Sequence, residues 1–217
     1  MPRTLGVLVA GGVGSRLGLG VPKALVRLGG ETLLARSIAT LAAVCDEVVV
    51  TAPASLAPTL APEIAPAPGG TRAHRIGFRA DAASGRGGPL AGLVSGLAGA
   101  AFDRVVVLGV DLPFMRSALL AALTARLAGH HAVVPMPGGI PQPLAAAYAG
   151  EACAILAGAF AAGERAPTRA LASLDVLSLD DDQLVRLPGG LDNFFNLNTS
   201  ADLAEAERRL ATRGVAR

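Results

Sequence analysis

The feature that most constrains the fold is a series of short, continuous apolar runs separated by segments with helical spacing. The first three runs are Leu5–Ala10, Val48–Val50 and Val105–Val110. Between the first two, apolar residues recur at helical spacing from Leu33 to Leu41, behind Thr32 as the expected N-cap. Strands that are apolar without alternation are buried on both faces, so this pattern predicts a parallel sheet covered by helices on both sides.

The rest of the chain continues this pattern, and we expect one α/β domain over residues 1–217 with three layers and a mostly parallel central sheet. The segment 53–70 is rich in Ala and Pro and is expected to be irregular. Further strands are expected near 132–134, 144–148 and 176–179. Further helices are expected over 89–100, from the cap Ser117 to about Leu127, from Glu151, and from Ala201 behind Thr199 or Ser200 as its cap.

Composition excludes several classes of function. A hydrophobic content of 52% argues against disorder, and a net charge of +2 with 3% aromatic residues argues against a nucleic-acid partner. The longest stretch without charged residues contains four prolines, so no membrane helix is expected. Cys45 and Cys153 form no disulfide framework, which together with the lack of a signal peptide predicts a cytoplasmic protein. The high apolar content is compatible with a homo-oligomer.

Lysine occurs once among the 19 basic residues, at Lys23, at the end of a glycine-rich loop that begins at Ala10. The loop is not a dinucleotide fingerprint, because Leu17 stands where the last glycine belongs, and Lys23 lacks the flanking residues of a phosphate loop. Successive small residues nevertheless let backbone N–H groups converge on an anion, and Arg16 and Lys23 add positive charge. The loop is therefore predicted to hold a triphosphate.

Asp111 follows the third apolar run directly, at the carboxyl end of a predicted strand. Open α/β sheets bind ligands at that edge, and Mg²⁺ prefers one or two carboxylates together with substrate phosphates. Asp111 is therefore a candidate ligand of Mg²⁺, the alternative being an N-cap of the next helix. By contrast, Asp180–Asp182 is expected to be a solvated acidic turn, and the three histidines show no metal-binding spacing.

Five blocks of sequence together resemble the molybdenum cofactor guanylyltransferases, in the order of that family and over nearly the whole chain. They are Leu8–Gly12 with Arg16 and Lys23, Gly88–Gly92, Asp111–Phe114, Gln142–Leu144 and Phe195–Thr199. The resemblance implies a Rossmann-like nucleotidyltransferase fold and a reaction with GTP and Mg²⁺. In that reaction the phosphate of molybdopterin attacks the α-phosphate of GTP and releases pyrophosphate.

The resemblance also implies roles for individual residues. Arg16, Lys23 and Asp111 would be catalytic, with Asp111 binding Mg²⁺ and GTP. Gln142, Asn196 and Asn198 would lie on the acceptor side. The nucleotide would contact Val9, Ala10, Gly11, Gly12, Lys23, Thr51, Asp81, Gly88 and Asp111. Thr51 stands where the family often has an Asn that helps to hold the guanine.

Two alternatives remain open at this stage. Pro22–Lys23 and the sequence around Thr51 look like the methylerythritol-phosphate cytidylyltransferases, so a cytidylyltransferase acting on that substrate or on molybdopterin is the first. The second is a nucleotide-binding module without catalysis. The residues themselves are consistent with catalysed nucleotidyl transfer. Arg16 and Lys23 are suited to hold the leaving pyrophosphate, and an acceptor phosphate that is already ionised needs no general base.

Overall fold

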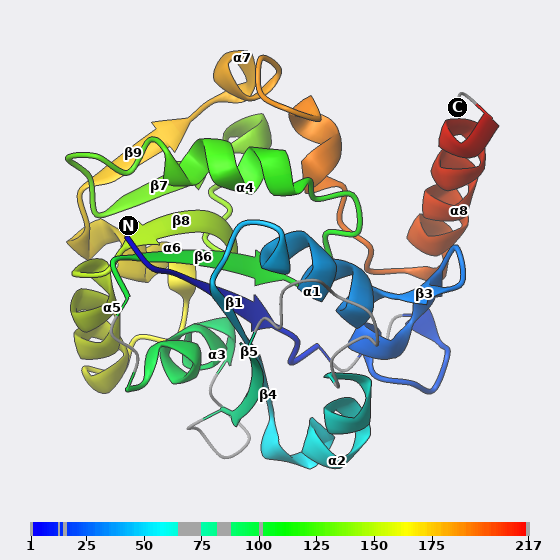
Figure 1. The fold of residues 1–217 in the computed structure, drawn as a ribbon, viewed down its shortest axis with the longest axis horizontal. Coiled ribbons are helices and arrows are strands. Elements are labelled where there is room, and N and C mark those ends of the chain that lie inside the picture. Colours follow the sequence, from blue (N-terminus) through cyan, green and yellow to red (C-terminus); the bar gives the residue numbers. More distant parts are fainter. Residues whose placement is uncertain are drawn as a thin grey trace.

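The computed structural model of the 217-residue chain describes residues 2–12, 14, 17–64, 75–81, 88–99 and 102–215, and it is drawn in Figure 1. Arg16, which was predicted to be catalytic, lies outside the described residues. None of the described helices combines the length and the apolar character that a membrane-spanning segment needs.

A seven-stranded sheet forms the centre of the molecule, in the order β5-β4-β1-β6-β8-β7-β9. Only β8 runs against its neighbours; the other pairs in the sheet are parallel. The expected mostly parallel sheet is thus confirmed. The strands are β1 Thr4–Val9, β4 Glu47–Ala52, β5 Arg75–Ala80, β6 Arg104–Gly109, β7 Ala132–Pro135, β8 Ala145–Ala149 and β9 Val176–Leu179.

Helices and short turns connect these strands. The α-helices are α1 Leu33–Ala42, α2 Ala57–Leu60, α3 Gly88–Leu97, α4 Ser117–Thr124, α5 Ala152–Ala161, α6 Pro167–Ala170, α7 Asp181–Leu184 and α8 Ser200–Val215. Single 3-10 turns include η2 Lys23–Leu25, η3 Ala54–Leu56, η4 Ala61–Ile64, η5 Pro137–Gly139, η6 Leu171–Ser173 and η7 Gly190–Phe194, and the pair β2 Arg27–Leu28 and β3 Glu31–Thr32 forms a small hairpin.

The side chains of the central strands β1, β4, β6 and β8 alternate between two apolar cores, one on each face of the sheet. Figure 1 shows the resulting layers, with the sheet between helices. In β6, Val106 and Leu108 pack on one face with α1 and α4. Val105 and Val107 pack on the other face with α3 and α5. Both faces of β1, β4 and β6 are buried, which is why their sequences read as continuous apolar runs.

Helix α8 lies at the side of the sheet, next to the β2–β3 hairpin, as Figure 1 shows in red and blue. The backbone N–H of Gly29 in this hairpin donates to Glu207 Oε1 at 3.0 Å. Gly29 has a φ of +61°, and a Cβ placed there would lie 2.9 Å from Leu210 Cδ1, so the hairpin turn fits closely against the helix only because it carries glycine.

Four local predictions can be compared with the structure. Thr32 caps α1 as expected, its Oγ1 accepting from the Ala35 N–H at 3.1 Å. Ser117 was predicted to be a cap, but it is the first helical residue, because extended backbone at Arg116 precedes it without a side-chain cap. The expectation for 53–70 was wrong over residues 54–64, which form η3, α2 and η4. Asp180–Asp182 are exposed to solvent as expected, but they begin a helix rather than form a turn, since Asp180 caps α7 through a reciprocal pair of bonds with Gln183.

Candidate active site

The glycine-rich loop folds back so that its last residue returns to the end of β1. The Lys23 N–H donates to the carbonyl oxygen of Gly12 at 3.2 Å. Gly14 has a φ of +67°, and a Cβ placed there would lie 3.1 Å from both Lys23 N and Val21 O. Glycine is therefore required at this crossing, because a side chain would push the two arms of the loop apart.

Lys23, Asp111 and Asn198 meet at the carboxyl end of the sheet. Lys23 Nζ donates to Asn198 Oδ1 at 2.5 Å and lies 3.3 Å from Asp111 Oδ2. The Lys23 side chain is 9% exposed and that of Asp111 is 32% exposed. A nearly buried ammonium thus has a charged and a neutral oxygen partner, while the carboxylate keeps one side open to solvent.

Asp111 is held in place by the end of β1 and by Leu197 rather than by a helix. The Val110 N–H donates to the Val9 carbonyl at 3.2 Å, and the Asp111 carbonyl accepts from the Leu197 N–H at 2.9 Å. A Cβ at Gly109 would lie only 2.7 Å from Asp111 Oδ1, so glycine at this position leaves the room that the carboxylate occupies. The alternative role of Asp111 as a helix cap is excluded, because α4 begins only at Ser117.

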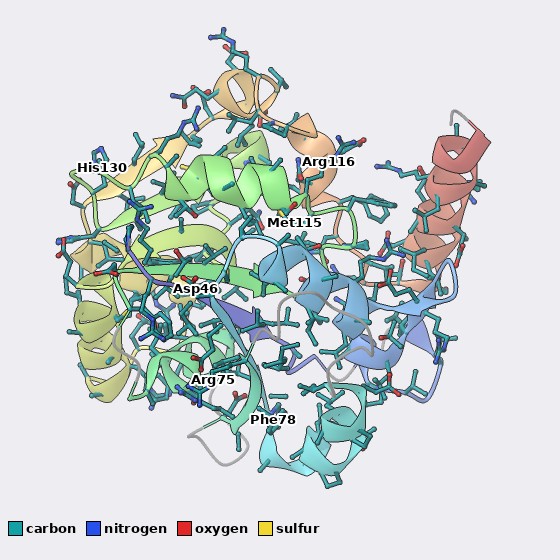
Figure 2. The ribbon with its side chains drawn as sticks, viewed as in Figure 1. Asp46, Arg75, Phe78, Met115, Arg116 and His130 are labelled. Carbon is teal, nitrogen blue, oxygen red and sulfur yellow. The ribbon has the colours of Figure 1, made fainter. Side chains whose placement is uncertain are left out.

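Residues 193–198, which we call the strap, run alongside the segment from Asp111 to Arg116. At one end the fully buried Asn193 accepts from the Arg116 N–H at 2.9 Å through its Oδ1. In the middle the rings of Phe114 and Phe195 lie 5.5 Å apart. Figure 2 labels Arg116, which lies beside the orange turn that leads into the strap. The strap thereby carries Asn198 to Lys23.

At its other end the strap is anchored by Asp202 of α8. Asp202 Oδ2 accepts from the N–H groups of Asn198 at 2.9 Å and of Thr199 at 2.7 Å. These bonds lower the pKa of the Asp202 carboxyl from its ordinary value. Sequence analysis missed both Asn193 and Asp202. The pattern Thr199-x-x-Asp202 is a capping-box signal that identifies Asp202, whereas Asn193 has no local signal.

A second group of predicted residues surrounds Asp81, at the end of β5. Its Oδ1 is buried and has no hydrogen-bond partner among the described residues. Burial raises the pKa of Asp81 above its ordinary value of 3.8. A Cβ at Gly92 would lie 3.4 Å from Asp81 Oδ1, and one at Gly11 would lie 3.7 Å from Oδ2. The two glycines therefore flank a carboxylate whose Oδ1 has no partner among the described groups.

Thr51 lies behind this carboxylate and is fully buried in β4. Its Oγ1 lies 3.4 Å from the Leu8 carbonyl, to which it donates, and its own carbonyl accepts from the Ala10 N–H at 2.8 Å. Val9 is paired in register with Thr51, so the predicted nucleotide residues of β1 and β4 end at one edge. Gly88 begins α3 with a φ of +63°.

Two predicted acceptor-side residues do not contact Lys23 among the described contacts. Gln142 lies on the segment entering β8, and its Nε2 donates to the Ile140 carbonyl at 3.3 Å. This segment adjoins the site, because the Gly109 N–H donates to the Leu144 carbonyl at 2.6 Å. Asn196 is exposed on the strap. Asn198 belongs instead with Lys23 and Asp111.

The fold has three layers, a central sheet between two layers of helices, and polar and charged residues gather at the carboxyl ends of its parallel strands. This is the architecture of the Rossmann-like nucleotidyltransferases. Residues 6–177 match the family model described as MobA-like NTP transferase domain. The chain therefore belongs to this family of nucleotidyltransferases, and the resemblance noted from the sequence blocks is confirmed.

Individual relatives agree with this assignment. A probable molybdenum cofactor guanylyltransferase of Natronomonas pharaonis is 33% identical, over 97% of this chain and 100% of the relative. The crystal structure of molybdopterin-guanine dinucleotide biosynthesis protein A from Archaeoglobus fulgidus matches with a TM-score of 0.75 at 28% identity, covering 97% of this chain and 100% of that one. A 2-C-methyl-D-erythritol 4-phosphate cytidylyltransferase of Deinococcus radiodurans is 56% identical over 55 residues, which is 25% of this chain and 23% of the relative.

Proposed function

We propose that the protein transfers GMP from GTP to the phosphate of molybdopterin and releases pyrophosphate. The observation that carries this proposal is the cluster of Lys23, Asp111 and Asn198 at the edge where the parallel strands end. The relative that matches over its whole length is named a molybdenum cofactor guanylyltransferase, whereas the cytidylyltransferase match covers a quarter of this chain. Full-length similarity therefore favours guanylyl transfer.

The carboxylate of Asp81, whose Oδ1 has no partner among the described residues, favours guanine over cytosine. A carboxylate accepts two parallel N–H donors well, and guanine presents its N1–H and N2–H side by side. Cytosine presents one N–H₂ group next to the acceptor N3, which would face the second oxygen of Asp81 unfavourably. Thr51 replaces the Asn of the family, but its hydroxyl is directed at the Leu8 carbonyl, so in this chain base selection falls to Asp81.

The donor set also suits magnesium. Asp111 supplies a carboxylate and Asn198 supplies an amide oxygen, and both groups contact Lys23 Nζ, so they lie close together. Mg²⁺ prefers such oxygen ligands together with substrate phosphates. Magnesium held there would supply charge neutralisation on the phosphate oxygens of GTP. Asp111 and Asn198 are the residues that would hold it.

In the transfer itself an oxygen of the acceptor phosphate forms a bond to the α-phosphorus, and the bond from that phosphorus to the bridging oxygen of pyrophosphate breaks. Lys23 has three N–H donors, two of which have partners among the described residues, so one can meet the leaving pyrophosphate. Gly11 and Gly12 present only backbone to the phosphates. The acceptor phosphate is already ionised, and the described site accordingly needs no histidine base.

The test measures pyrophosphate release with molybdopterin, Mg²⁺ and each of GTP, CTP, ATP and UTP. We expect release with GTP, and about 10²–10³-fold less from Lys23→Ala, which removes a donor to the developing charge. Arg126→Ala, which removes an exposed cation that follows the end of α4 and donates to the Ala122 carbonyl, serves as the matched control and should retain wild-type turnover. Release with CTP alone would establish a cytidylyltransferase, and no release with any nucleotide would leave only a binding module.

A further inference from the structure

Asp202 joins the start of α8 to the Lys23 cluster. A single oxygen of this carboxylate accepts from two consecutive backbone N–H groups, those of Asn198 and Thr199. In the opposite direction, Thr199 Oγ1 accepts from the Asp202 N–H at 3.2 Å, which caps the helix. Thr199 and Asp202 thus form a reciprocal cap of α8, and Asp202 alone adds the bond from the Asn198 N–H. Replacing Thr199 weakens the cap only, whereas replacing Asp202 weakens the cap and also removes the anchor of Asn198.

The anchor limits where Asn198 can place its side chain. Its backbone is fixed on one side by Asp202 and on the other by the bond from Leu197 to the Asp111 carbonyl. Its Oδ1 then accepts from Lys23 Nζ at 2.5 Å. Lysine has a long, flexible stem that does not define the position of its ammonium by itself, so the fixed acceptor defines it.

We propose that Asp202 is a positioning residue for the transfer reaction, holding Asn198 so that the Lys23 ammonium stays beside Asp111. Asp202 does this without touching substrate. The competing interpretation is that Asp202 only stabilises the first turn of α8. The kinetic part of the proposal rests on the proposed function, and the spectroscopic part does not.

The decisive comparison is between Asp202→Ala and Thr199→Ala. Asp202→Ala removes the bond from the Asn198 N–H of the strap together with its own half of the helix cap, whereas Thr199→Ala removes only the Thr199 half of the cap and leaves the bond from Asn198 in place. Because Lys23 acts on charge that builds up on the leaving group, Asp202→Ala should lower kcat by about tenfold or more and change KM for GTP less. Thr199→Ala should stay within about twofold of the wild-type kcat.

Two further variants complete the set. Asp180→Ala removes the N-cap of α7, whose side-chain bonds are made with Gln183 and not with Asn198 or Lys23, and it should lower the melting temperature without lowering kcat. Asp202→Asn keeps a neutral acceptor oxygen at the anchor, and it should restore part of the kcat lost in Asp202→Ala. It also tests the proposal if the alanine variant does not fold.

The chain has one lysine, so a protein labelled with ¹⁵N-lysine gives a single side-chain Nζ signal, and this signal reports the anchor without any assay of activity. We expect Asp202→Ala to shift the Lys23 signal or to speed its hydrogen exchange, while Thr199→Ala and Asp180→Ala leave it unchanged. An unchanged signal in Asp202→Ala overturns the proposal, as does an equal loss of kcat in the Asp202 and Thr199 variants. If the wild-type protein releases no pyrophosphate, the proposed function fails, and the Nζ signal alone decides whether Asp202 positions Lys23.

Discussion

Replacement of Gly96 by alanine places a methyl group between α3 and β1. The added Cβ would lie 2.5 Å from Val7 Cγ1 and 3.0 Å from Val7 Cγ2, well inside the 3.5–4.0 Å at which carbon atoms attract. Val7 is fully buried in the centre of the sheet and its branched side chain is stiff, so it has no room to rotate away. The helix must move outward instead.

Two opposing effects set the magnitude. Alanine in place of glycine stabilises the interior of a helix by about 1 kcal/mol. Overpacking of a close contact costs about 1–3 kcal/mol, and an overlap of about 1 Å on a fixed side chain puts Gly96→Ala at the upper end. The net loss is then about 2 kcal/mol, or a melting temperature lower by about 4–8 °C for a chain of this size.

Gly158→Ala is the matched control, because Gly158 is exposed inside α5 and a Cβ there would meet no atom within 4 Å. It carries the same gain in helix propensity without the overlap, so it should raise the melting temperature by about 2–4 °C. Thermal unfolding followed by circular dichroism measures both variants, and adding Val7→Ala to Gly96→Ala should recover stability beyond the sum of the single changes. Equal stabilisation by Gly96→Ala and Gly158→Ala would refute the reasoning.

Three further predictions concern the site and the thiols. Gly109→Ala places a Cβ 2.7 Å from Asp111 Oδ1, so we expect pyrophosphate release to fall by about tenfold or more while the melting temperature changes by under about 4 °C. Because burial raises the pKa of Asp81, its ionised form lowers the stability of the fold above pH 3.8. Asp81→Asn should therefore raise the melting temperature at pH 7, and this gain should disappear as the pH falls through the raised pKa toward 3.8. The same variant should weaken the preference for GTP in a thermal-shift comparison with CTP. Burial raises the pKa of Cys45 to about 12 and that of Cys153 to about 11, so a thiol-reactive dye at pH 8 should label neither within minutes in the folded protein and both in denaturant.

The central strands could be predicted from sequence because burial on both faces leaves a plain signal. Strand β5 could not, since its residues are only partly buried and it lies at the sheet edge. Its sequence lacks a continuous apolar run. It does alternate, with Ile76 and Phe78 on the core face and Arg75 and Arg79 on the other, and this period-two signal was missed because only continuous apolar runs were taken as strands; Figure 2 labels Arg75 and Phe78. The turns of 54–64 were missed because alanine and proline together were read as irregular, although proline is common in the first turn of a helix.

The site was predictable in part because two of its residues stand out in the sequence. Lys23 stands out by composition and Asp111 by its place after an apolar run, and the structure brings the two together. Asn198 was found only through the resemblance to a family. The contact between Asn198 and Lys23 joins residues 175 positions apart, and no local pattern encodes such a distance. The roles of these residues in transfer stay predictions until the variants are measured.

The same long separation has a consequence during protein synthesis. At a ribosomal rate of about 5–20 residues per second, Asn198 is added about 9–35 seconds after Lys23. For that interval the nascent chain already carries its glycine loop, yet the ammonium lacks its neutral partner and the strap that delivers it. The centre therefore cannot be completed before Asn198 has been synthesised, and nascent chains that end before the strap hold an incomplete one.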